Sequence, residues 1–401
     1  MSRAPLFDPR DFQAQLQPYA LYARLREEDP VHRSPFGMWV LSRDADVRVA
    51  LRDPRFSSRP SRFSVHARQE LQGLPASRMV RDMVMFQDAP EHTRLRRLLA
   101  RVITDNLASN LRERILHCVD ELLAPHAARG EMDLLHDFAI PLPVQVISEL
   151  LGIPPQDRHL LKRWAGSVFQ VFSPITDASA YRELNGAVQE FRDYLGPLVQ
   201  LRRRKPQRDV ISQLTQLRDE ADALNDDELI TSCILLFANG EESFAHALCN
   251  GLHALLNDAG QLQQLRADPS LVRPAFEEFI RYDSPAQVVG RTLLEPIELH
   301  GRVIPKGVPV YLLLGSANRD PARWAEPDRF DICRADADHL GFGHGRHSCL
   351  GAGIARVEAQ VALTRLLERL QGLALAEADP PWRADFFLRG LQRLPVRFRP
   401  F

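Results

Sequence analysis

The chain has 401 residues, of which 45% are hydrophobic and 26% charged, a composition typical of a globular protein with a large core. The formal net charge of -1 gives no indication of nucleic acid or an anionic membrane as a partner. Five scattered cysteines without a CxxC pair argue against a disulfide framework and fit a reducing compartment. Since the sequence has no signal peptide and no run of about 18 apolar residues, it predicts a cytoplasmic protein without a membrane anchor.

Hydrophobic periodicity predicts a mainly α chain with short strands near both ends, hence an α+β class. In chain order we expect a strand at 37–43, a helix at 111–124 with Cys118 as a core thiol, a hairpin within 297–314 interrupted at 305–307, and a strand at 395–398. The sequence has no internal repeat and no Gly- or Ser-rich linker. We therefore expect one domain over residues 1–401.

The longest predicted helix begins at Asn225, an N-cap with Glu228 at the capping-box position, and continues to about Leu256. Its middle, residues 238–243, reads Ala-Asn-Gly-Glu-Glu-Ser. Two acids and an amide are costly in a buried helix, so an exposed polar stripe is one interpretation. We favour a functional notch, because residues 234–238 before it are apolar on every face.

The strongest signal is a glycine-rich loop at residues 341–353, GFGHGRHSCLGAG. Its five glycines permit positive φ and a close approach of the backbone to a flat ligand. Cys349 precedes a helix expected over 354–370, and a thiol at a helix N-terminus has a lowered pKa. Such a thiolate is a soft ligand for iron, which favours a haem-thiolate site.

Three other interpretations of this loop remain open. In the first, Cys349 is a catalytic nucleophile with His347 as its base. In the second, zinc is bound by His339, His344, His347 and Cys349. In the third, the loop holds a phosphate, although the sequence GxxxxGK[ST] is absent.

The loop resembles the haem-binding signature of the cytochrome P450 family, F-G-x-G-x-[HR]-x-C-x-G. Every specified position is filled, by Phe342, Gly343, Gly345, His347, Cys349 and Gly351. The resemblance runs over nearly the whole chain and implies the cytochrome P450 fold, a triangular helical prism with a small β region. It also implies haem b as the cofactor, with Cys349 as the iron ligand and Phe342, Gly343, His347 and Gly351 binding the cofactor.

Other motifs of that family follow in the family's order. Glu278 and Arg281 match its E-x-x-R pair, at i and i+3 of a helix, and Arg329 would be the third member of a buried network. Four residues match ligands of the haem propionates, through charge-assisted hydrogen bonds: His92, Arg96, Arg291 and His347. Taken singly, each would be interpreted as a surface residue, but their shared order favours function.

Residues 240–243, Gly-Glu-Glu-Ser, resemble the family's oxygen-activation segment G-x-[DE]-T. By this resemblance Glu242 is the acid and Ser243 the alcohol that deliver protons to dioxygen. Serine replaces the usual threonine; it is less constrained at χ1 but keeps the hydroxyl group.

The resemblance implies a monooxygenase that uses dioxygen and two external electrons to hydroxylate or epoxidise a lipophilic small molecule, in secondary-metabolite biosynthesis. Because the chain has no GxGxxG fingerprint, electrons from NAD(P)H would come through a separate ferredoxin or flavodoxin with its reductase. Arg94, Arg97 and Arg346 would supply positive charge for that partner. We expect a monomer without a nucleic-acid partner.

The candidate substrate contacts are largely apolar, and several could equally be plain core. They are Met83, Val84, Met85, Phe169, Phe172, Phe237, Asn239, Gly240, Val288, Val289, Phe387 and Leu388. Two rival functions keep the haem, namely a peroxide-using or non-oxidative haem-thiolate enzyme and a haem-binding sensor module. Peroxide-driven turnover would identify the first, and haem binding without substrate-dependent activity the second. The retained Glu242 and Ser243 favour oxygen activation over the first.

Overall fold

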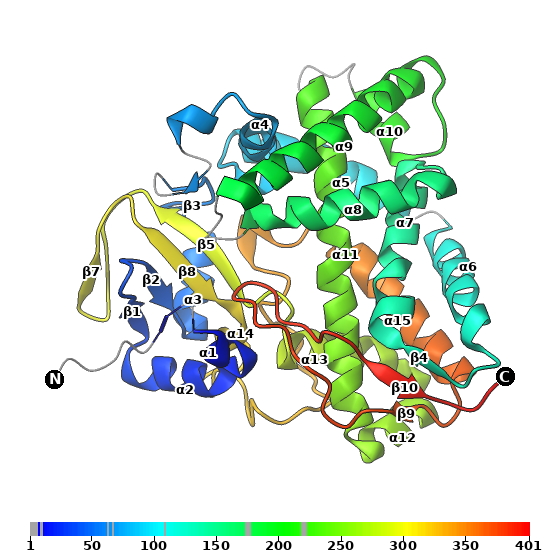
Figure 1. Cartoon of the computed structure of the whole chain (residues 1–401). Coiled ribbons are helices and arrows are strands. Elements are labelled where there is room, and N and C mark those ends of the chain that lie inside the picture. The colour runs from blue at the N-terminus through cyan, green and yellow to red at the C-terminus, as the bar shows by residue number, and fades with distance from the viewer. Residues whose placement is uncertain are drawn as a thin grey trace. The chain divides into compact units, whose positions relative to one another are not determined.

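A computed structural model of the chain describes residues 7–8, 11–61, 64–65, 68–107, 110–172, 178–217 and 223–401. The chain divides into two compact units. Unit 1 comprises Met1–Ser57, Val119–Pro141 and Ser243–Phe401, and unit 2 comprises Ser58–Cys118 and Leu142–Glu242. Helix α11, Asp226–Leu256, begins in unit 2 and ends in unit 1 (Figure 1). The single domain expected over residues 1–401 stays a prediction.

Unit 1 contains the strands that the structure describes, together with a set of mostly short helices. The helices are α1 (Phe12–Leu16), α2 (Pro18–Glu28), α3 (Asp44–Arg52), α12 (Ala259–Ala267), α13 (Val272–Tyr282), α14 (Leu314–Ala317) and α15 (Ala352–Arg369). The strands are β1 (Val31–Arg33), β2 (Trp39–Leu41), β3 (Phe56–Ser57), β4 (Glu131–Asp133), β5 (Val288–Leu293), β6 (Ile297–Leu299), β7 (Arg302–Ile304), β8 (Pro309–Leu313), β9 (Ala374–Leu375) and β10 (Pro395–Arg397).

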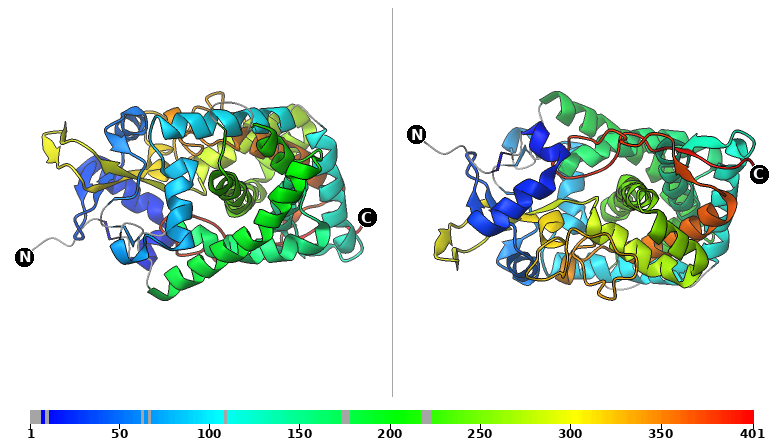
Figure 2. Two further views of the ribbon diagram at one scale, coloured as in Figure 1. Left: turned by 90° about the horizontal axis from the view of Figure 1, so that it is seen from above. Right: turned by 90° about the horizontal axis from the view of Figure 1, so that it is seen from below.

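The largest sheet has the strand order β1-β2-β8-β5-β3 and joins the N-terminal strands β1, β2 and β3 to β5 and β8 from much later in the chain. Strand β2 pairs in parallel with β8, so that Val40 lies opposite Tyr311, while the other pairs in this sheet are antiparallel. Figure 2 shows the N-terminal strands in blue beside β5 and β8 in yellow. Buried Leu41, Val47 and Leu312 belong to the core packed against this sheet. The sheet thereby fixes β5, which carries Arg291.

The hairpin expected within 297–314 has a different form. Strands β6 and β7 form the hairpin, and its turn is His300–Gly301, with φ of 50° and 74°. Residues 305–307 lead instead to β8, which pairs with β5 in the five-stranded sheet. The prediction failed here because a turn sequence marks a reversal of the chain without showing which strands pair.

Unit 2 is helical. Its helices are α4 (Pro75–Asp82), α5 (Glu91–Leu107), α8 (Arg158–Phe169), α9 (Ala178–Arg204) and α10 (Val210–Gln216), with the first part of α11. Helices α6 (Leu111–Leu123) and α7 (Pro141–Leu151) each cross a boundary between the units. Phe191 of α9 is central to this core, since its ring contacts Trp164 of α8 and Phe237 of α11. Cys118 is fully buried, which confirms it as a core thiol.

Helix α11 is continuous over its whole length and is seen along its axis in Figure 2. Its start has the expected capping box: the Glu228 N–H donates to the Asn225 side chain at 2.9 Å, and the Asn225 N–H donates to the Glu228 carboxylate at 3.0 Å. This reciprocal pair satisfies two amide groups that a helix start leaves without partners.

One helical segment among the described residues is long and apolar enough to cross a membrane by length and composition alone. It is Leu134–Leu151, and 67% of it is buried inside the protein. Such burial is the behaviour of a helix in a protein core.

Candidate active site

The loop that carries Cys349 is held by hydrogen bonds within its own backbone. The Cys349 N–H donates to the carbonyl oxygen of Phe342 at 2.7 Å, and the Gly343 N–H donates to that of Leu340 at 2.7 Å. Gly343 and Gly345 have φ of 68° and 71°, in the left-handed region that favours glycine. The expected positive φ is thus confirmed at these two positions.

Two glycines of the loop allow it to pack closely against neighbouring elements of unit 1. A Cβ atom on Gly341 would lie 2.2 Å from Cγ2 of Ile280 in α13. A Cβ atom on Gly345 would lie 3.1 Å from the carbonyl oxygen of Leu51 in α3. These two glycines therefore allow a close approach to the protein itself, which holds the loop in place, while the predicted approach to a flat ligand stays a prediction.

The Cys349 side chain is exposed and lies three residues before Ala352, the first residue of α15. Cys118, Cys233 and Cys249 are buried, and burial raises the pKa of Cys233 to about 12. Cys333 is exposed, but it lies in no glycine loop, and its sulfur accepts a hydrogen bond from Gln264 at 3.1 Å. Cys349 therefore combines exposure with a position just before a helix.

The zinc interpretation of this loop loses its support in the structure. His339 is buried, its Nε2 lies 3.1 Å from the Glu277 carboxylate, and its Nδ1 accepts the Gly341 N–H at 3.1 Å. Across the part of the chain that the structure describes, no group of three or more His, Cys, Asp and Glu side chains is arranged to hold a metal ion. His339 instead fixes the start of the loop.

The expected pair Glu278 and Arg281 is present on α13 and is buried. Arg281 donates from Nε and Nη2 to the two carboxylate oxygens of Glu278, at 2.7 and 2.8 Å. The guanidinium group also donates to backbone carbonyl groups, those of Asn318, Pro327 and Arg329. A bidentate ion pair with further acceptors satisfies both charges in a buried position.

The prediction of Arg329 as the third side chain of this network is wrong. The Arg329 side chain is 60% exposed and pairs with Glu326, so it contributes only its carbonyl group to Arg281. Arg334 takes the place instead, with its Nε 3.2 Å from the Glu278 carboxylate and its side chain 13% exposed. Sequence reasoning missed Arg334 because no spacing or motif relates residue 334 to 278.

The polar segment of α11 is partly exposed, although it lies between two stretches of the helix, residues 229–235 and 244–252, that are buried. Leu236, Asn239, Gly240 and Ser243 are partly exposed and share one helical face, at intervals of three and four residues. A Cβ atom built on Gly240 would meet no other atom within 4 Å. This face fits the notch that the sequence predicts.

The two acids of this segment differ in their surroundings. Glu241 is buried, whereas Glu242 is partly exposed. Burial raises the pKa of Glu241 to about 7, with a further increase from Glu242 and a decrease from Lys162. The side chains of consecutive residues on a helix point in directions about 100° apart. Neighbouring acids can therefore differ in burial, as Glu241 and Glu242 do.

The four propionate candidates come from both units. His92 is buried and Arg96 partly exposed, one turn apart on α5 in unit 2. Arg291 is partly exposed on β5 in unit 1, where its Nη1 donates to the Gly290 carbonyl oxygen at 2.8 Å. His347 is partly exposed in the 3-10 turn Gly345–His347.

Of the three arginines expected to attract a redox partner, Arg94 has its charge offset within unit 2. It forms an ion pair with Glu228 and donates to the Ala223 carbonyl oxygen at 3.3 Å. Arg97 and Arg346 are exposed. Two of the three arginines that the sequence predicts for this role, Arg97 and Arg346, therefore present their charge at the surface.

In unit 2, the candidate substrate contacts separate into buried and accessible residues. Asn239 donates from Nδ2 to the sulfur of Met85 at 3.5 Å, so these two candidates lie together. Met83, Val84 and Phe237 are buried, and the Phe237 ring packs against Phe191. Phe169 is partly exposed at the end of α8; the side chain of Phe172 lies outside the described residues. Asn239, Gly240 and Met85 are thus the better-placed candidates of this unit.

In unit 1, the structure brings three of the other four candidates together, Val288, Phe387 and Leu388, whereas Val289 packs against the separate core that contains Leu41 and Leu312. Val288 is buried in a cluster with Tyr311 and Phe387 at its edge. The Gln287 N–H donates to the Phe387 carbonyl oxygen at 2.8 Å, and Leu388 forms a bridge with Ala286. The segments that carry Val288 and Phe387, about one hundred residues apart in the sequence, therefore lie side by side.

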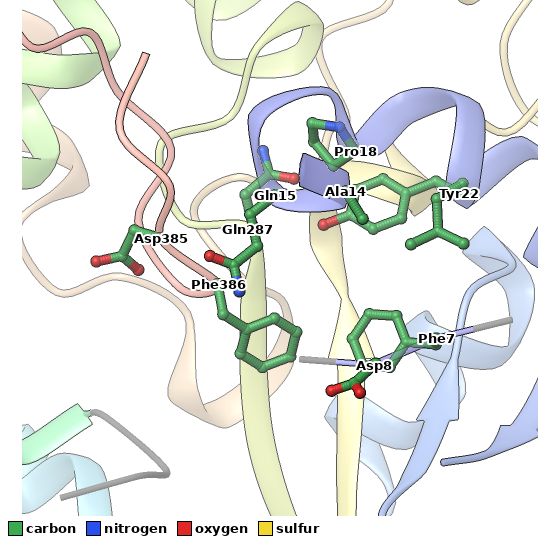
Figure 3. Close-up of a pocket in the computed structure, with 10 residues that line it drawn as sticks. Phe7, Asp8, Ala14, Gln15, Pro18, Tyr22, Gln287, Asp385 and Phe386 are labelled. Atoms are coloured by element: carbon green, nitrogen blue, oxygen red, sulfur yellow. The ribbon is translucent and has the colours of Figure 1, made fainter. Parts of the chain in front are cut away.

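A small pocket of unit 1 lies beside these residues (Figure 3). Phe7, Tyr22, Gln287 and Phe386 are among its lining residues, and the rings of Phe7 and Phe386 are 5.4 Å apart. Its volume of about 20 Å³ is enough for about one water molecule. It is too small for a lipophilic substrate, and none of the candidate substrate contacts lines it.

Comparison with known proteins agrees with the resemblance of the loop. The family model for Cytochrome P450 matches residues 157–394. The chain is 38% identical to the biotin biosynthesis cytochrome P450 of Bacillus subtilis, over 95% of this chain and 96% of the relative. It is also 38% identical to the mycinamicin IV hydroxylase/epoxidase of Micromonospora griseorubida, over 94% of each chain.

The fold agrees as well. The crystal structure of P450BioI in complex with a hexadec-9Z-enoic acid-ligated acyl carrier protein matches with a TM-score of 0.90 and 36% identity. That match covers 96% of this chain and all of the other. The fold is therefore the cytochrome P450 fold, mainly α with a small β region, as the resemblance implies.

The residues present fit haem b, the cofactor of this family. Cys349 offers an exposed sulfur on a fixed loop, and the cationic or donor side chains of Arg96, Arg291 and His347 suit carboxylate groups. When bound, haem ligated by a thiolate supplies the cleavage of the O–O bond. Its electrons originate from NAD(P)H and arrive through external redox partners. The chain belongs to the cytochrome P450 family, and it is a haem-thiolate monooxygenase.

Proposed function

We propose that Cys349 is the axial ligand of the haem iron in this monooxygenase. The observation that carries the proposal is the exposed Cys349 side chain on a loop fixed by the hydrogen bond from its own N–H to Phe342. A thiolate at this place lies close to the start of α15, where the helix dipole favours negative charge. Phe342, Gly343 and Gly351 would shape the loop around the cofactor.

We propose further that His92, Arg96, Arg291 and His347 bind the haem propionates. The partly exposed Arg96, Arg291 and His347 leave polar surface accessible to a ligand. Charge-assisted hydrogen bonds from such groups to two carboxylates are about twice as strong as neutral ones.

Glu242 and Ser243 are proposed to hold and transfer protons at the notch of α11. Both side chains are partly exposed, unlike the buried residues that flank them on the helix. A hydroxyl group can donate and accept at once, which is the requirement for passing on a proton. The buried Glu241, one residue away, is not part of this proposal.

The substrate is proposed to be a lipophilic small molecule bound by candidate contacts that include Asn239, Met85, Val288 and Phe387. Asn239 beside Met85, and Val288 with Phe387, support this assignment because each pair unites candidates distant in sequence. The mycinamicin IV hydroxylase/epoxidase is a relative of similar length, which supports hydroxylation or epoxidation of a natural product. A ferredoxin or flavodoxin with its reductase would supply the electrons, to a monomer in the cytoplasm.

A labelling experiment tests this function. The haem-loaded protein would be titrated with a panel of fatty acids, macrolides and steroids, and binders identified by the change in the haem absorption spectrum. Each binder would then be incubated with NADPH, ferredoxin, its reductase and ¹⁸O₂. We expect one ¹⁸O atom in the product; product formed without labelled oxygen, or only with peroxide, would contradict a monooxygenase.

A further inference from the structure

A buried carboxylate beside the Cys349 loop is held by two side chains from different elements. Glu277 of α13 accepts hydrogen bonds from Arg356 of α15, from Nε to Oε1 at 2.6 Å and from Nη2 to Oε2 at 2.9 Å. Its Oε2 also lies 3.1 Å from Nε2 of His339. Burial alone would raise the pKa of Glu277, but the hydrogen bonds with Arg356 and His339 lower it to about 2. The carboxylate is therefore ionised at neutral pH.

Both partners of this carboxylate contact Phe342 of the loop. The Arg356 guanidinium carbon lies 4.6 Å from the centroid of the Phe342 ring, and the His339 ring lies 5.7 Å from it. The carbonyl oxygen of Phe342 accepts the Cys349 N–H at 2.7 Å. A continuous set of contacts therefore connects Glu277 to the backbone of Cys349.

Arg356 acts on Cys349 through charge as well. The hydrogen bond with Glu277 raises the pKa of Arg356, and the negative charge of Cys349 raises it further. Because this interaction is mutual, the positive charge of Arg356 stabilises negative charge on the Cys349 sulfur. The carboxylate of Glu277 offsets part of that charge. The field at the sulfur thus depends on both members of the pair.

We propose that Glu277 and Arg356 are positioning residues for the thiolate ligand, and that they act in opposite directions on the reduction of the haem iron. Arg356 stabilises the additional negative charge that reduction brings, and so makes reduction easier. Glu277 fixes the place of Arg356 and weakens its effect. This inference rests on the proposed role of Cys349 as the iron ligand.

The reduction potential of the haem-loaded protein tests the proposal. Arg356→Gln removes the positive charge and is expected to make the potential more negative. Glu277→Gln keeps the shape of the side chain, removes the offsetting charge, and is expected to make the potential more positive. The double variant is expected to return towards the wild-type value. A merely structural cluster would loosen the loop in both single variants and shift both potentials in the same direction, which would overturn the proposal.

Two further variants protect this test against a general loss of folding. Arg356→Lys keeps the charge and is expected to lie closer to the wild-type potential than Arg356→Gln does. Arg365 on the same helix forms a matched bidentate pair with Asp120, at 2.7 and 2.9 Å. It lies nine residues further along α15, about 13 Å at 1.5 Å per residue, so Arg365→Gln is expected to keep the wild-type potential. Equal shifts in Arg365→Gln and Arg356→Gln would overturn the proposal.

The difference spectrum of the reduced protein with carbon monoxide tests the role of Cys349 as the iron ligand separately from the role of Glu277 and Arg356. A strongly red-shifted band in wild type, with unchanged potentials in Arg356→Gln and Glu277→Gln, would overturn the role of this pair alone. A wild-type protein without that band would overturn the role of Cys349, and the role of the pair with it.

Discussion

Glu278 and Arg281, three residues apart on α13, form a bidentate ion pair in which both side chains are 1% exposed. Two charges in such a position are costly unless every donor and acceptor is satisfied. Here the backbone carbonyl groups of Asn318, Pro327 and Arg329 accept the remaining donors of Arg281. The pair thereby joins α13 to the segment that leads to the Cys349 loop.

Glu278→Ala is expected to lower the free energy of unfolding by about 3–5 kcal/mol, because Arg281 would stay buried without its carboxylate. Denaturant unfolding followed by circular dichroism measures the change. Arg329→Ala serves as a control and should change stability by about 0.5 kcal/mol or less, since that side chain is exposed. Arg334→Ala should cost more than Arg329→Ala; the reverse order would show that the second arginine of the network has been misassigned.

Two glycines of α11 should respond in opposite ways to alanine. A Cβ atom on Gly240 meets nothing within 4 Å, so Gly240→Ala should stabilise the helix by about 0.5–1 kcal/mol and weaken the binding of bulky substrates. A Cβ atom on Gly251 would lie 1.9 Å from Cγ of Phe279, so Gly251→Ala should destabilise the protein by about 1–3 kcal/mol or more. Thermal unfolding and substrate titration distinguish them, and equal stability of the two variants would contradict the open space at Gly240.

Glu241 should make stability depend on pH between about 4.5 and 7. Burial raises its pKa from 4.5 to about 7 in the folded protein, so within this range the folded state binds more protons than the unfolded state. Its contribution to stability is therefore present below about pH 4.5 and is lost as the pH rises to about 7. Glu241→Gln cannot lose a proton and should be more stable than wild type at pH 8 but not at pH 4.5. A stability difference that is constant across this range would contradict the burial of the acid.

Ser243→Ala should lower the fraction of consumed oxygen that appears in product, because the hydroxyl group that passes on protons is removed. Ser243→Thr keeps the hydroxyl group and should retain coupling at or above the wild-type level. The ratio of product to NADPH consumed, with peroxide measured in parallel, checks both variants. Equal coupling in Ser243→Ala and wild type would remove Ser243 from the proton path.

The parts of the site that could be predicted from sequence are those with local causes. The capping box at Asn225 and the positive φ of Gly343 and Gly345 follow from the residues themselves. The i, i+3 spacing of Glu278 and Arg281 likewise places them together on a helix. The family resemblance then supplied the order of the motifs, which no single spacing contains.

The parts that could not be predicted depend on contacts between distant segments. Nothing in the sequence near residue 334 indicates that Arg334 forms an ion pair with Glu278. The family resemblance pointed instead to Arg329, whose side chain pairs with Glu326. The parallel pairing of β2 with β8 joins residues about 270 positions apart, and periodicity gives no partner for a short strand. The burial of Glu241 instead of Glu242 depends on the rotation of α11, which a single residue changes by about 100°.

The central claim is that Cys349 ligates the haem iron. The most direct measurement is the carbon monoxide difference spectrum of the reduced protein, in wild type, Cys349→Ala and the control Cys333→Ala. We predict a strongly red-shifted Soret band in wild type and in Cys333→Ala, and its loss in Cys349→Ala. A band that survives in Cys349→Ala, or disappears in Cys333→Ala, would contradict the assignment.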